Sequence, residues 1–287
     1  MSDFKLKKAS IVGIAGLGLI GGSFAKAFKE NANIKVYATD LNEDVVAQAI
    51  KDGTIDGLLD EVTIKECDLI IPALYPKAIN EYLKKMAPYI RKNALVIDTG
   101  GLKRVVCKEC FPLAKEYGFT FVGGHPMAGK KYSGYEYSTG SLFNDASMIL
   151  VPEDPEDKEL IDAVTNILSP CNFGMITVCS AEKHDEMIAF TSEMAHIVSN
   201  AYIKSPTALA HKGFSAGSYK DMTRVAWLNE TMWTEIFMEN KDNLIKEIDY
   251  ITSFLNEYKS ALIENDSDCM WKLLHDGKVA KETVDGK

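Results

Sequence analysis

The glycine-rich segment at residues 16–21, Gly-Leu-Gly-Leu-Ile-Gly, constrains the fold of this chain more than any other feature. It follows a short apolar run at residues 11–15 and precedes a stretch of helical character at residues 22–29. In a strand–turn–helix unit the first glycine permits the tight turn, the second lets the backbone approach a pyrophosphate, and the third allows close helix–strand packing. The helix N-terminus attracts the negative charge. The segment therefore predicts a dinucleotide site; a glycine turn that binds nothing is the alternative.

An acidic residue ends the next apolar run. Asp40 stands about 20 residues beyond the glycines, where a carboxylate accepts hydrogen bonds from the ribose hydroxyls. The same charge would repel a 2′-phosphate, and no Arg or Lys follows before Lys51. We therefore predict NAD rather than NADP as the cofactor. The predicted cofactor-binding residues are Gly16, Gly18, Leu19, Ile20, Gly21 and Asp40.

Short apolar runs alternate with amphipathic stretches through the first part of the chain. The runs are rich in Ile, Val and Leu and lack period-two alternation, which is typical of strands buried on both faces. A helix is predicted at 155–168, with Asp154 as its N-cap and Pro155 as its first residue. This order predicts a Rossmann-like α/β domain at 1–179 with a doubly wound sheet. The predicted strands are 11–15, 34–39, 69–74, 94–98, 120–123, 148–151 and 173–178, and two further helices are 42–51 and 78–90.

The strand signal ends after Ser180, and residues 180–287 are predicted to form an all-α domain. Helices are expected at about 181–204, 230–239 and 241–264, and the tail at 279–287 is expected to be disordered. The last helix carries a narrow apolar seam that needs a partner helix. We therefore expect this domain to form a homodimer, with packing inside one chain as the alternative. The seam consists of Leu244, Ile248, Ile251, Leu255, Tyr258 and Leu262.

Composition narrows the classes of partner. The 287-residue chain has a formal net charge of −9, which argues against nucleic acid because phosphate binding needs a basic surface. The most apolar stretch, 11–24, is too short to cross a membrane, and the first residues lack the apolar core of a secretory signal. We therefore expect a cytoplasmic enzyme with a small-molecule substrate, without nucleic-acid or membrane partners.

Cys107 and Cys110 form a C-x-x-C pair, which raises the question of a metal or redox site. A zinc site would need two further ligands at close spacing, and none is evident in the sequence. A cytosolic compartment would keep thiols reduced. We expect two small residues on a helix and no metal.

Three more segments carry recognisable motifs. Residues 124–129 read Gly-His-Pro-Met-Ala-Gly and are followed by Ser133-Gly134; residues 184–185 read His-Asp; residues 220–224 read Lys-Asp-Met-Thr-Arg. In this order, behind a dinucleotide fold, they resemble the prephenate and arogenate dehydrogenase family over most of the chain. The resemblance implies oxidative decarboxylation of prephenate to 4-hydroxyphenylpyruvate with NAD, in tyrosine biosynthesis. The alternative within the family is oxidation of arogenate to tyrosine.

The family's reaction assigns roles to particular residues. Oxidising a ring alcohol requires a base near the hydroxyl, and histidine suits this task. The resemblance makes His125 the catalytic base that contacts this hydroxyl. It makes Arg224 the ligand of a substrate carboxylate, for which a planar guanidinium is suited. Lys220 is a second, weaker cation, and Ser192 and His196 are expected to line the substrate pocket from the helical domain.

The chain departs from the family pattern at three places. Residues 98–103 read Asp-Thr-Gly-Gly-Leu-Lys, so Gly101 replaces a serine that assists the histidine in many members. Thr99, which is assigned to the substrate site, or a water molecule could take over this task, or the base is simply tuned differently. Lys130 and Lys131 stand where an acidic residue is frequent, which favours doubly anionic prephenate over zwitterionic arogenate. Glu193 stands where a histidine is frequent.

Two rival readings remain open. Other two-domain dehydrogenases, such as β-hydroxyacid dehydrogenases or pyrroline-5-carboxylate reductase, share the glycine loop and a helical second domain. The segments around His125 and Arg224 fit those enzymes poorly. A catalytically silent NAD-sensing protein would keep the glycine loop and Asp40, but it would have no need for His125 and Arg224 together.

Overall fold

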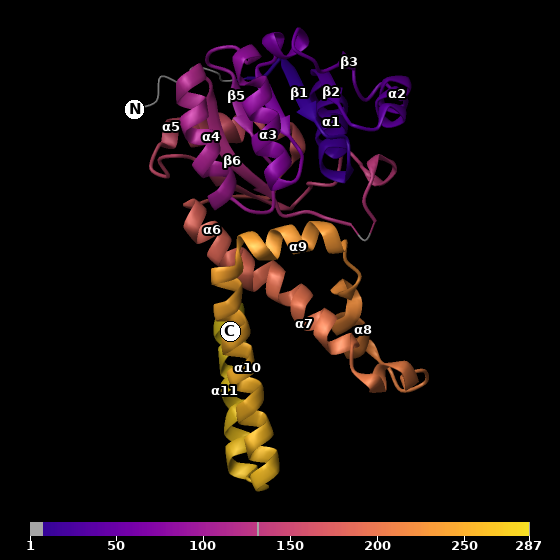
Figure 1. Ribbon diagram of the computed structural model, residues 1–287, viewed down its shortest axis with the longest axis vertical. Helices are drawn as coiled ribbons and strands as arrows, with labels where there is room; N and C mark the ends of the chain where they lie inside the picture. The colour runs from indigo at the N-terminus through magenta and orange to yellow at the C-terminus, as the bar shows by residue number, and fades with distance from the viewer. Residues whose placement is uncertain (1–7, 131, 287) are drawn as a thin grey trace. The chain divides into compact units, whose positions relative to one another are not determined.

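The computed structural model describes residues 8–130 and 132–286, and the contacts divide the chain into two units. The first unit comprises Met1–Met187 and the second Ile188–Lys287. The first holds a sheet covered by helices, and the second is built of helices alone (Figure 1). The predicted α/β domain followed by an all-α domain is confirmed.

An eight-stranded sheet forms the centre of the first unit, in the order β3-β2-β1-β4-β5-β6-β7-β8. Neighbouring strands are parallel except for β6 and β7, which are antiparallel. Each predicted strand is present, and β3, which has two residues, was not predicted because so short a run carries no period. The strands are β1 Ile11–Ala15, β2 Lys35–Thr39, β3 Gly57–Leu58, β4 Leu69–Pro72, β5 Leu95–Ile97, β6 Thr120–Pro126, β7 Ser147–Val151 and β8 Met175–Val178.

Helices cover both faces of this sheet, as the unalternating apolar strands require. One apolar core contains Phe24 and Phe28 of α1 and Val164 of α5. A second core contains Leu83 of α3 and Val106 of α4. Successive side chains of a strand point to opposite faces, so the strands supply residues to both cores. The helices of this unit are α1 Leu19–Ala32, α2 Glu43–Lys51, α3 Pro76–Met86, α4 Arg104–Tyr117, α5 Lys158–Ile167 and α6 Ala181–Ile188.

Two local predictions in this unit are tested by the structure. Helix α5 is capped by Asp157, whose side chain accepts a hydrogen bond from the Leu160 amide at 3.1 Å. The prediction of Asp154 as its N-cap and Pro155 as its first residue was wrong, because Asp154 instead accepts the Glu156 amide in the preceding turn. Cys107 and Cys110 lie buried on α4. Burial raises the pKa of both thiols, which keeps them protonated and unreactive.

The second unit contains one long helical run and a helical pair. The run from α6 continues through a π-helical turn, Ala189–Glu193, into α7. In that turn Glu193 is fully buried, and both its carboxylate oxygens accept hydrogen bonds from the side-chain Nδ2 of Asn240, at 3.0 and 3.1 Å. The α-helices of this unit are α7 Met194–Ile203, α8 Gly217–Thr223, α9 Glu230–Glu239, α10 Lys241–Glu264 and α11 Ser267–Asp285.

Helix α11 corrects the prediction of a disordered tail. After the left-handed Asn265, Asp266 caps a new helix by accepting the Cys269 amide at 2.9 Å. The helix returns alongside α10, and the Tyr258 hydroxyl donates to the Leu273 carbonyl at 3.3 Å (Figure 1). The prediction failed because the polar composition of the segment hid a cap followed by a weakly apolar face.

The apolar seam of α10 is only partly covered within the unit. Leu244 is buried, whereas the side chains of Leu255 and Leu262 are 63% and 68% exposed. An apolar stripe that one chain leaves open is typical of a helix that packs against a second subunit. The partly exposed seam is therefore consistent with the expected homodimer.

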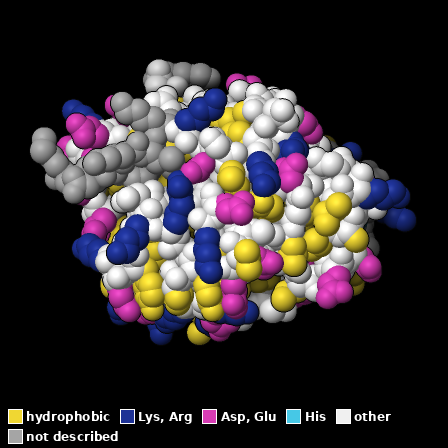
Figure 2. Space-filling view, turned by 90° about the horizontal axis from the view of Figure 1, so that it is seen from above, with side chains coloured by type: hydrophobic (Ala, Val, Ile, Leu, Met, Phe, Trp, Pro, Cys, Tyr) yellow, Lys and Arg dark blue, Asp and Glu magenta, His cyan; other side chains and the backbone are white. Residues whose placement is uncertain are grey.

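Three further observations concern the surface charge, the helices and the arrangement of possible metal ligands. Figure 2 shows lysine, arginine and acidic side chains interspersed over the face that it views. Among residues 8–130 and 132–286, no helix is long and apolar enough to cross a membrane. The same part of the chain contains no cluster of three or more histidine, cysteine or acidic side chains arranged to hold a metal ion.

Candidate functional site

The glycine segment forms the turn between β1 and α1. Gly16 has a φ of +92°, which disfavours other residues, and a Cβ there would lie 2.5 Å from the Ala73 carbonyl oxygen. A Cβ on Gly21 would lie 1.8 Å from the Gly16 carbonyl oxygen, so the helix approaches the turn as only glycine allows. A Cβ on Gly18 would meet nothing within 4 Å. The surface beside Gly18 is therefore open at the start of a helix, where an anion is favoured.

Asp40 lies next to this turn. Its Oδ2 accepts a hydrogen bond from the Leu17 amide at 2.7 Å, and its Oδ1 accepts one from the Asn42 amide at 2.9 Å. Two predicted cofactor-binding elements, 23 residues apart in sequence, are thus joined directly. Leu19 and Ile20 form the first turn of α1 behind Gly18.

His125 is the penultimate residue of β6. The carboxyl ends of β1, β4, β5 and β6 lie at one edge of the sheet because these strands are parallel. The glycine turn follows β1 at this edge, and ligands of open α/β sheets bind there. The structure therefore brings His125 and the predicted dinucleotide site to the same edge.

A buried ion pair supports the strand end that carries His125. The side chains of Lys103 and Asp98 are both fully buried and form a salt bridge. Lys103 Nζ also donates to the Gly124 carbonyl at 2.7 Å, while the Gly124 amide donates to Asp98 Oδ1 at 3.1 Å. The pair therefore holds both backbone polar groups of Gly124, the residue that precedes His125. A Cβ on Gly124 would lie 2.4 Å from the Asp98 carbonyl oxygen, which explains the glycine before the histidine.

A second histidine and an aspartate stand behind His125. His125 Nδ1 lies 2.9 Å from His184 Nε2, and His184 Nδ1 lies 2.7 Å from Asp185 Oδ1. We call these three residues the Asp–His–His triad. Both His184 and Asp185 are buried, at 1% exposure each, on the first turns of α6. Sequence reasoning recognised the His-Asp motif but gave it no role, because its partner lies 59 residues away.

The surroundings control the charge of the triad. Burial lowers the pKa of His125 well below its ordinary value, and the His184 ring and the Lys103 ammonium lower it further. Burial also lowers the pKa of His184, against the raising effect of Asp185. Burial alone would raise the pKa of Asp185, but its hydrogen bonds outweigh that effect and lower it. At neutral pH the triad therefore holds one carboxylate and two neutral imidazoles.

The positions of Thr99 and of the two lysines that follow the His125 motif say less about the substrate site. Thr99 follows β5 at the same sheet edge, and within the described part of the chain no hydrogen bond joins it to His125. Lys130 donates to the Tyr137 carbonyl at 2.8 Å. Lys131 lies outside the described residues. Gly101 stands at the start of the turn that leads to Lys103.

The second unit brings two of its predicted residues together. His196 on α7 forms a hydrogen bond of 2.9 Å through Nδ1 with the Val225 carbonyl, next to Arg224 in the chain. Burial lowers the pKa of His196, and the Arg224 charge lowers it further. Arg224 begins a 3₁₀ turn directly after α8, and Lys220 is exposed one turn earlier. Ser192 lies in the π-helical turn, a feature frequent at functional sites.

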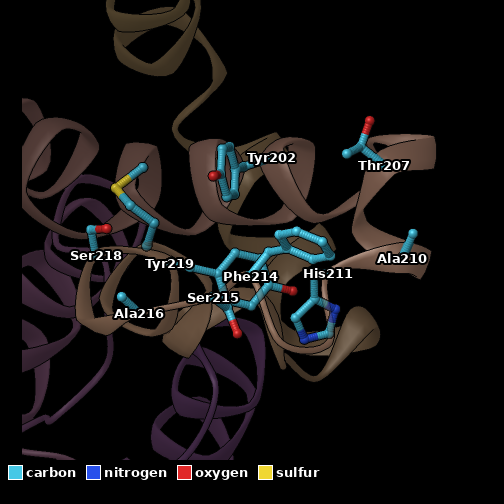
Figure 3. A pocket seen from close by; sticks show the side chains of 10 residues that line it. Tyr202, Thr207, Ala210, His211, Phe214, Ser215, Ala216, Ser218 and Tyr219 are labelled. Carbon is cyan, nitrogen blue, oxygen red and sulfur yellow. The ribbon is translucent and has the colours of Figure 1, made fainter.

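Two hollows are present in the described part of the second unit. The first, of about 370 Å³, contains His196. Its ring lies 3.9 Å from the Trp233 ring, which in turn lies 5.3 Å from that of Phe237. The second, of about 590 Å³, is lined by aromatic residues, with the His211 ring stacked on Tyr219 at 4.7 Å (Figure 3). It contains none of the residues that the sequence predicted for the substrate.

Family profiles cover most of the chain. Residues 24–177 match the nucleotide-binding domain of prephenate dehydrogenase, and residues 180–276 match its dimerization domain. The chain belongs to the prephenate dehydrogenase family. The two matches meet near the predicted domain boundary at 179, whereas the contacts place α6 with the first unit. The match to a dimerization domain agrees with the open seam of α10.

Related proteins carry names within this family. The chain is 29% identical to a prephenate dehydrogenase of Bacillus subtilis over 95% of its own length and 75% of that protein. It is 28% identical to a cyclohexadienyl dehydrogenase of Zymomonas mobilis over 94% of each chain. Among solved structures, a prephenate dehydrogenase from A. aeolicus in complex with hydroxyphenyl propionate and NAD+ has a TM-score of 0.82 and 29% identity, covering 96% of this chain and 98% of that one.

Proposed function

We propose that this chain is an NAD-dependent prephenate dehydrogenase that converts prephenate into 4-hydroxyphenylpyruvate and CO2, in tyrosine biosynthesis. The observation that carries the proposal is the neutral His125 at the same edge of the sheet as the glycine turn. A base is needed there to remove a proton from the ring hydroxyl. Membership of the prephenate dehydrogenase family supports the choice of substrate class.

The residues around the glycine turn fit a dinucleotide. Gly18 leaves open space for a pyrophosphate, and the amides of Leu19 and Ile20 lie at the start of α1, where negative charge is favoured. Asp40 offers a carboxylate beside the turn for ribose hydroxyls and would repel a 2′-phosphate. These features support NAD over NADP. Bound NAD would supply the nicotinamide that accepts hydride from the ring carbon bearing the hydroxyl.

His125 takes up and returns the proton of the substrate's hydroxyl. Its ring accepts the proton of the C4 hydroxyl as that oxygen becomes a ketone. The bond between the ring and its carboxylate then breaks, CO2 leaves, and the electron pair passes through the ring to the ketone oxygen. The resulting phenolate recovers a proton from His125, so the histidine is neutral again for the next turnover. No metal is needed, because the transient ketone accepts the electrons.

The helical unit is proposed to bind the substrate's negative charges. Arg224 is exposed and offers a planar fork that pairs with a carboxylate. Lys220 adds a second positive charge one turn earlier, while the half-buried Ser192 and His196 offer hydrogen bonds. Thr99 is the proposed polar contact from the end of β5. We further propose that the chain acts as a homodimer, through the helical unit, in the cytoplasm.

A side-by-side assay tests the proposal. Purified protein is given prephenate or arogenate, each with NAD or NADP, and the absorbance of the reduced cofactor is followed. We expect the highest kcat/KM with prephenate and NAD, since the lysine-rich segment after His125 favours a doubly anionic substrate. A higher value with arogenate would move the substrate assignment to the other member of the family. Absence of turnover on both substrates, despite NAD binding, would refute the enzymatic function.

A further inference from the structure

Asp185 is held as an anion by the groups around it. Its Oδ1 accepts hydrogen bonds from the Lys103 amide at 2.8 Å and from His184 Nδ1 at 2.7 Å. Its Oδ2 accepts the Arg104 amide at 3.0 Å and the Arg104 Nε at 3.3 Å. The two amides are the first of helix α4, which has no cap from its own side chains, so Asp185 also receives the favourable field of a helix N-terminus.

A carboxylate that only accepts hydrogen bonds fixes the protons on both histidines. Because Asp185 cannot donate, His184 Nδ1 must carry the proton between them. A neutral imidazole has one N–H, so His184 Nε2 is left as an acceptor. The 2.9 Å contact then requires His125 Nδ1 to donate. By the same count, His125 Nε2 has no proton and presents a lone pair.

We propose that His184 and Asp185 are the positioning residues of the active site: they hold His125 in the one tautomer whose Nε2 can remove the substrate's proton. This inference rests on the proposed function, because it concerns the base of that reaction. His184 also takes over the task of the family's serine, because Gly101 has no hydroxyl with which to orient His125. Lys103 and Asp98 fix the backbone at Gly124, whereas His184 fixes the ring of His125.

The hydrogen bonds of the triad also remain in place after His125 has taken the proton. The imidazolium then donates through Nδ1 to a neutral His184, whose other side faces the Asp185 carboxylate. The His184 ring and the Lys103 ammonium both disfavour the charge of the imidazolium, although the salt bridge with Asp98 partly neutralises Lys103. The proton is thus accepted at Nε2 and returned from the same atom, while the Nδ1 proton stays in the chain of hydrogen bonds.

The tautomers can be read directly by nitrogen NMR of the full-length protein labelled with 15N-histidine. The chain has five histidines, so the ring signals can be assigned by single substitutions. We expect His125 to show a protonated Nδ1 and an unprotonated Nε2 at neutral pH. In Asp185→Asn an amide nitrogen placed toward His184 Nδ1 donates to it, which should reverse both rings and place the proton of His125 on Nε2. A wild-type His125 protonated on Nε2 would overturn the proposal.

Kinetics with prephenate and NAD provide the second measurement. A wrong tautomer in comparable triads costs on the order of 10⁴ in kcat, so Asp185→Asn should lose about 10²–10⁴-fold in kcat with little change in KM. His184→Gln keeps an acceptor facing His125 and should retain far more kcat than His184→Phe, which keeps a ring but no acceptor. Equal losses in these two variants would contradict positioning by a hydrogen bond.

Asp157→Asn is the matched control, because it makes the same change at the N-cap of α5. It should leave the His125 tautomer and kcat unchanged, and a loss equal to that of Asp185→Asn would overturn the specific role of the triad. The NMR pattern needs neither substrate nor turnover. A wild-type protein with the expected tautomers but no dehydrogenase activity would therefore refute the proposed function and leave the triad standing.

Discussion

The two units hold their candidate residues in opposite ways. In the first unit, Asp98, Lys103, His184 and Asp185 are almost completely buried, and each is hydrogen-bonded within a network that ends at His125. In the second unit, Lys220 and Arg224 are exposed, and His196 and Ser192 are half-buried. Proton transfer requires a fixed atom, while charged ligands can be captured by side chains that remain in water. The contrast supports the proposal that the first unit carries out the chemistry and that the second captures the substrate.

The sharpest way to break this contrast is to remove the base. His125→Asn keeps a polar side chain but cannot take the hydroxyl proton. Since general bases contribute about 10²–10⁴-fold, kcat should fall by that factor while KM stays within a few-fold. Stopped-assay measurement of NADH from prephenate checks this, with circular dichroism as the control for folding. Wild-type kcat in this variant would show that the proton goes elsewhere.

Loss of the buried ion pair between Lys103 and Asp98 should lower the free energy of unfolding. Lys103→Met leaves the Asp98 carboxylate buried without its cation, and breaking such a pair costs about 3–5 kcal/mol. The free energy of unfolding in urea measures the loss. Lys220→Met is the matched control, and a surface change of this kind should stay within about 0.5 kcal/mol. Similar values for both lysines would contradict the contrast between a buried network and a solvated surface.

Loss of a residue that binds the substrate's negative charges should raise KM. Arg224→Gln removes a charge-assisted contact worth about 1.5–3 kcal/mol, so KM for prephenate should rise about 10–100-fold with a smaller change in kcat. Lys220→Gln should raise KM less, because a single exposed ammonium makes a weaker contact than a planar fork. Steady-state kinetics of both variants show which substitution raises KM more. A larger effect at Lys220 would reverse the assignment of the main anchor.

The smallest expected effect is on the dependence of kcat/KM on pH. Protonation of His125 abolishes its action as a base, and its pKa is well below the ordinary histidine value. Activity should therefore persist as pH falls through the usual histidine range near 6.5 and decline only below it. The profile of kcat/KM, which reports the free enzyme, checks this expectation. An acidic limb centred near or above pH 6.5 would show that the base is not buried as described.

How far sequence alone predicted these features depends on the range of each contact. All sheet strands except β3 follow from short local apolar runs, α10 follows from its apolar periodicity, and the glycine turn with Asp40 follows from a motif within one supersecondary unit. Helix α11 was missed because its start depends on a single cap at Asp266 and its stability on packing against α10.

The support of the base could not be predicted in the same way. His184 meets His125 across 59 residues, and Asp185 meets the Lys103 amide across 82. Contacts of this kind arise only when α6 folds onto the start of α4, so no local pattern reveals them. The missing serine at Gly101 indicated that something must orient His125, but the fold was needed to identify the Asp–His–His triad.

Parallel determination of kcat and KM for His125→Asn and Arg224→Gln, on prephenate with saturating NAD, tests the division of labour most directly. The account predicts a split: the His125 variant loses kcat by at least about 10²-fold at nearly constant KM, and the Arg224 variant mainly raises KM. If both variants changed the same parameter by similar factors, the separation of chemistry and substrate capture between the two units would be contradicted.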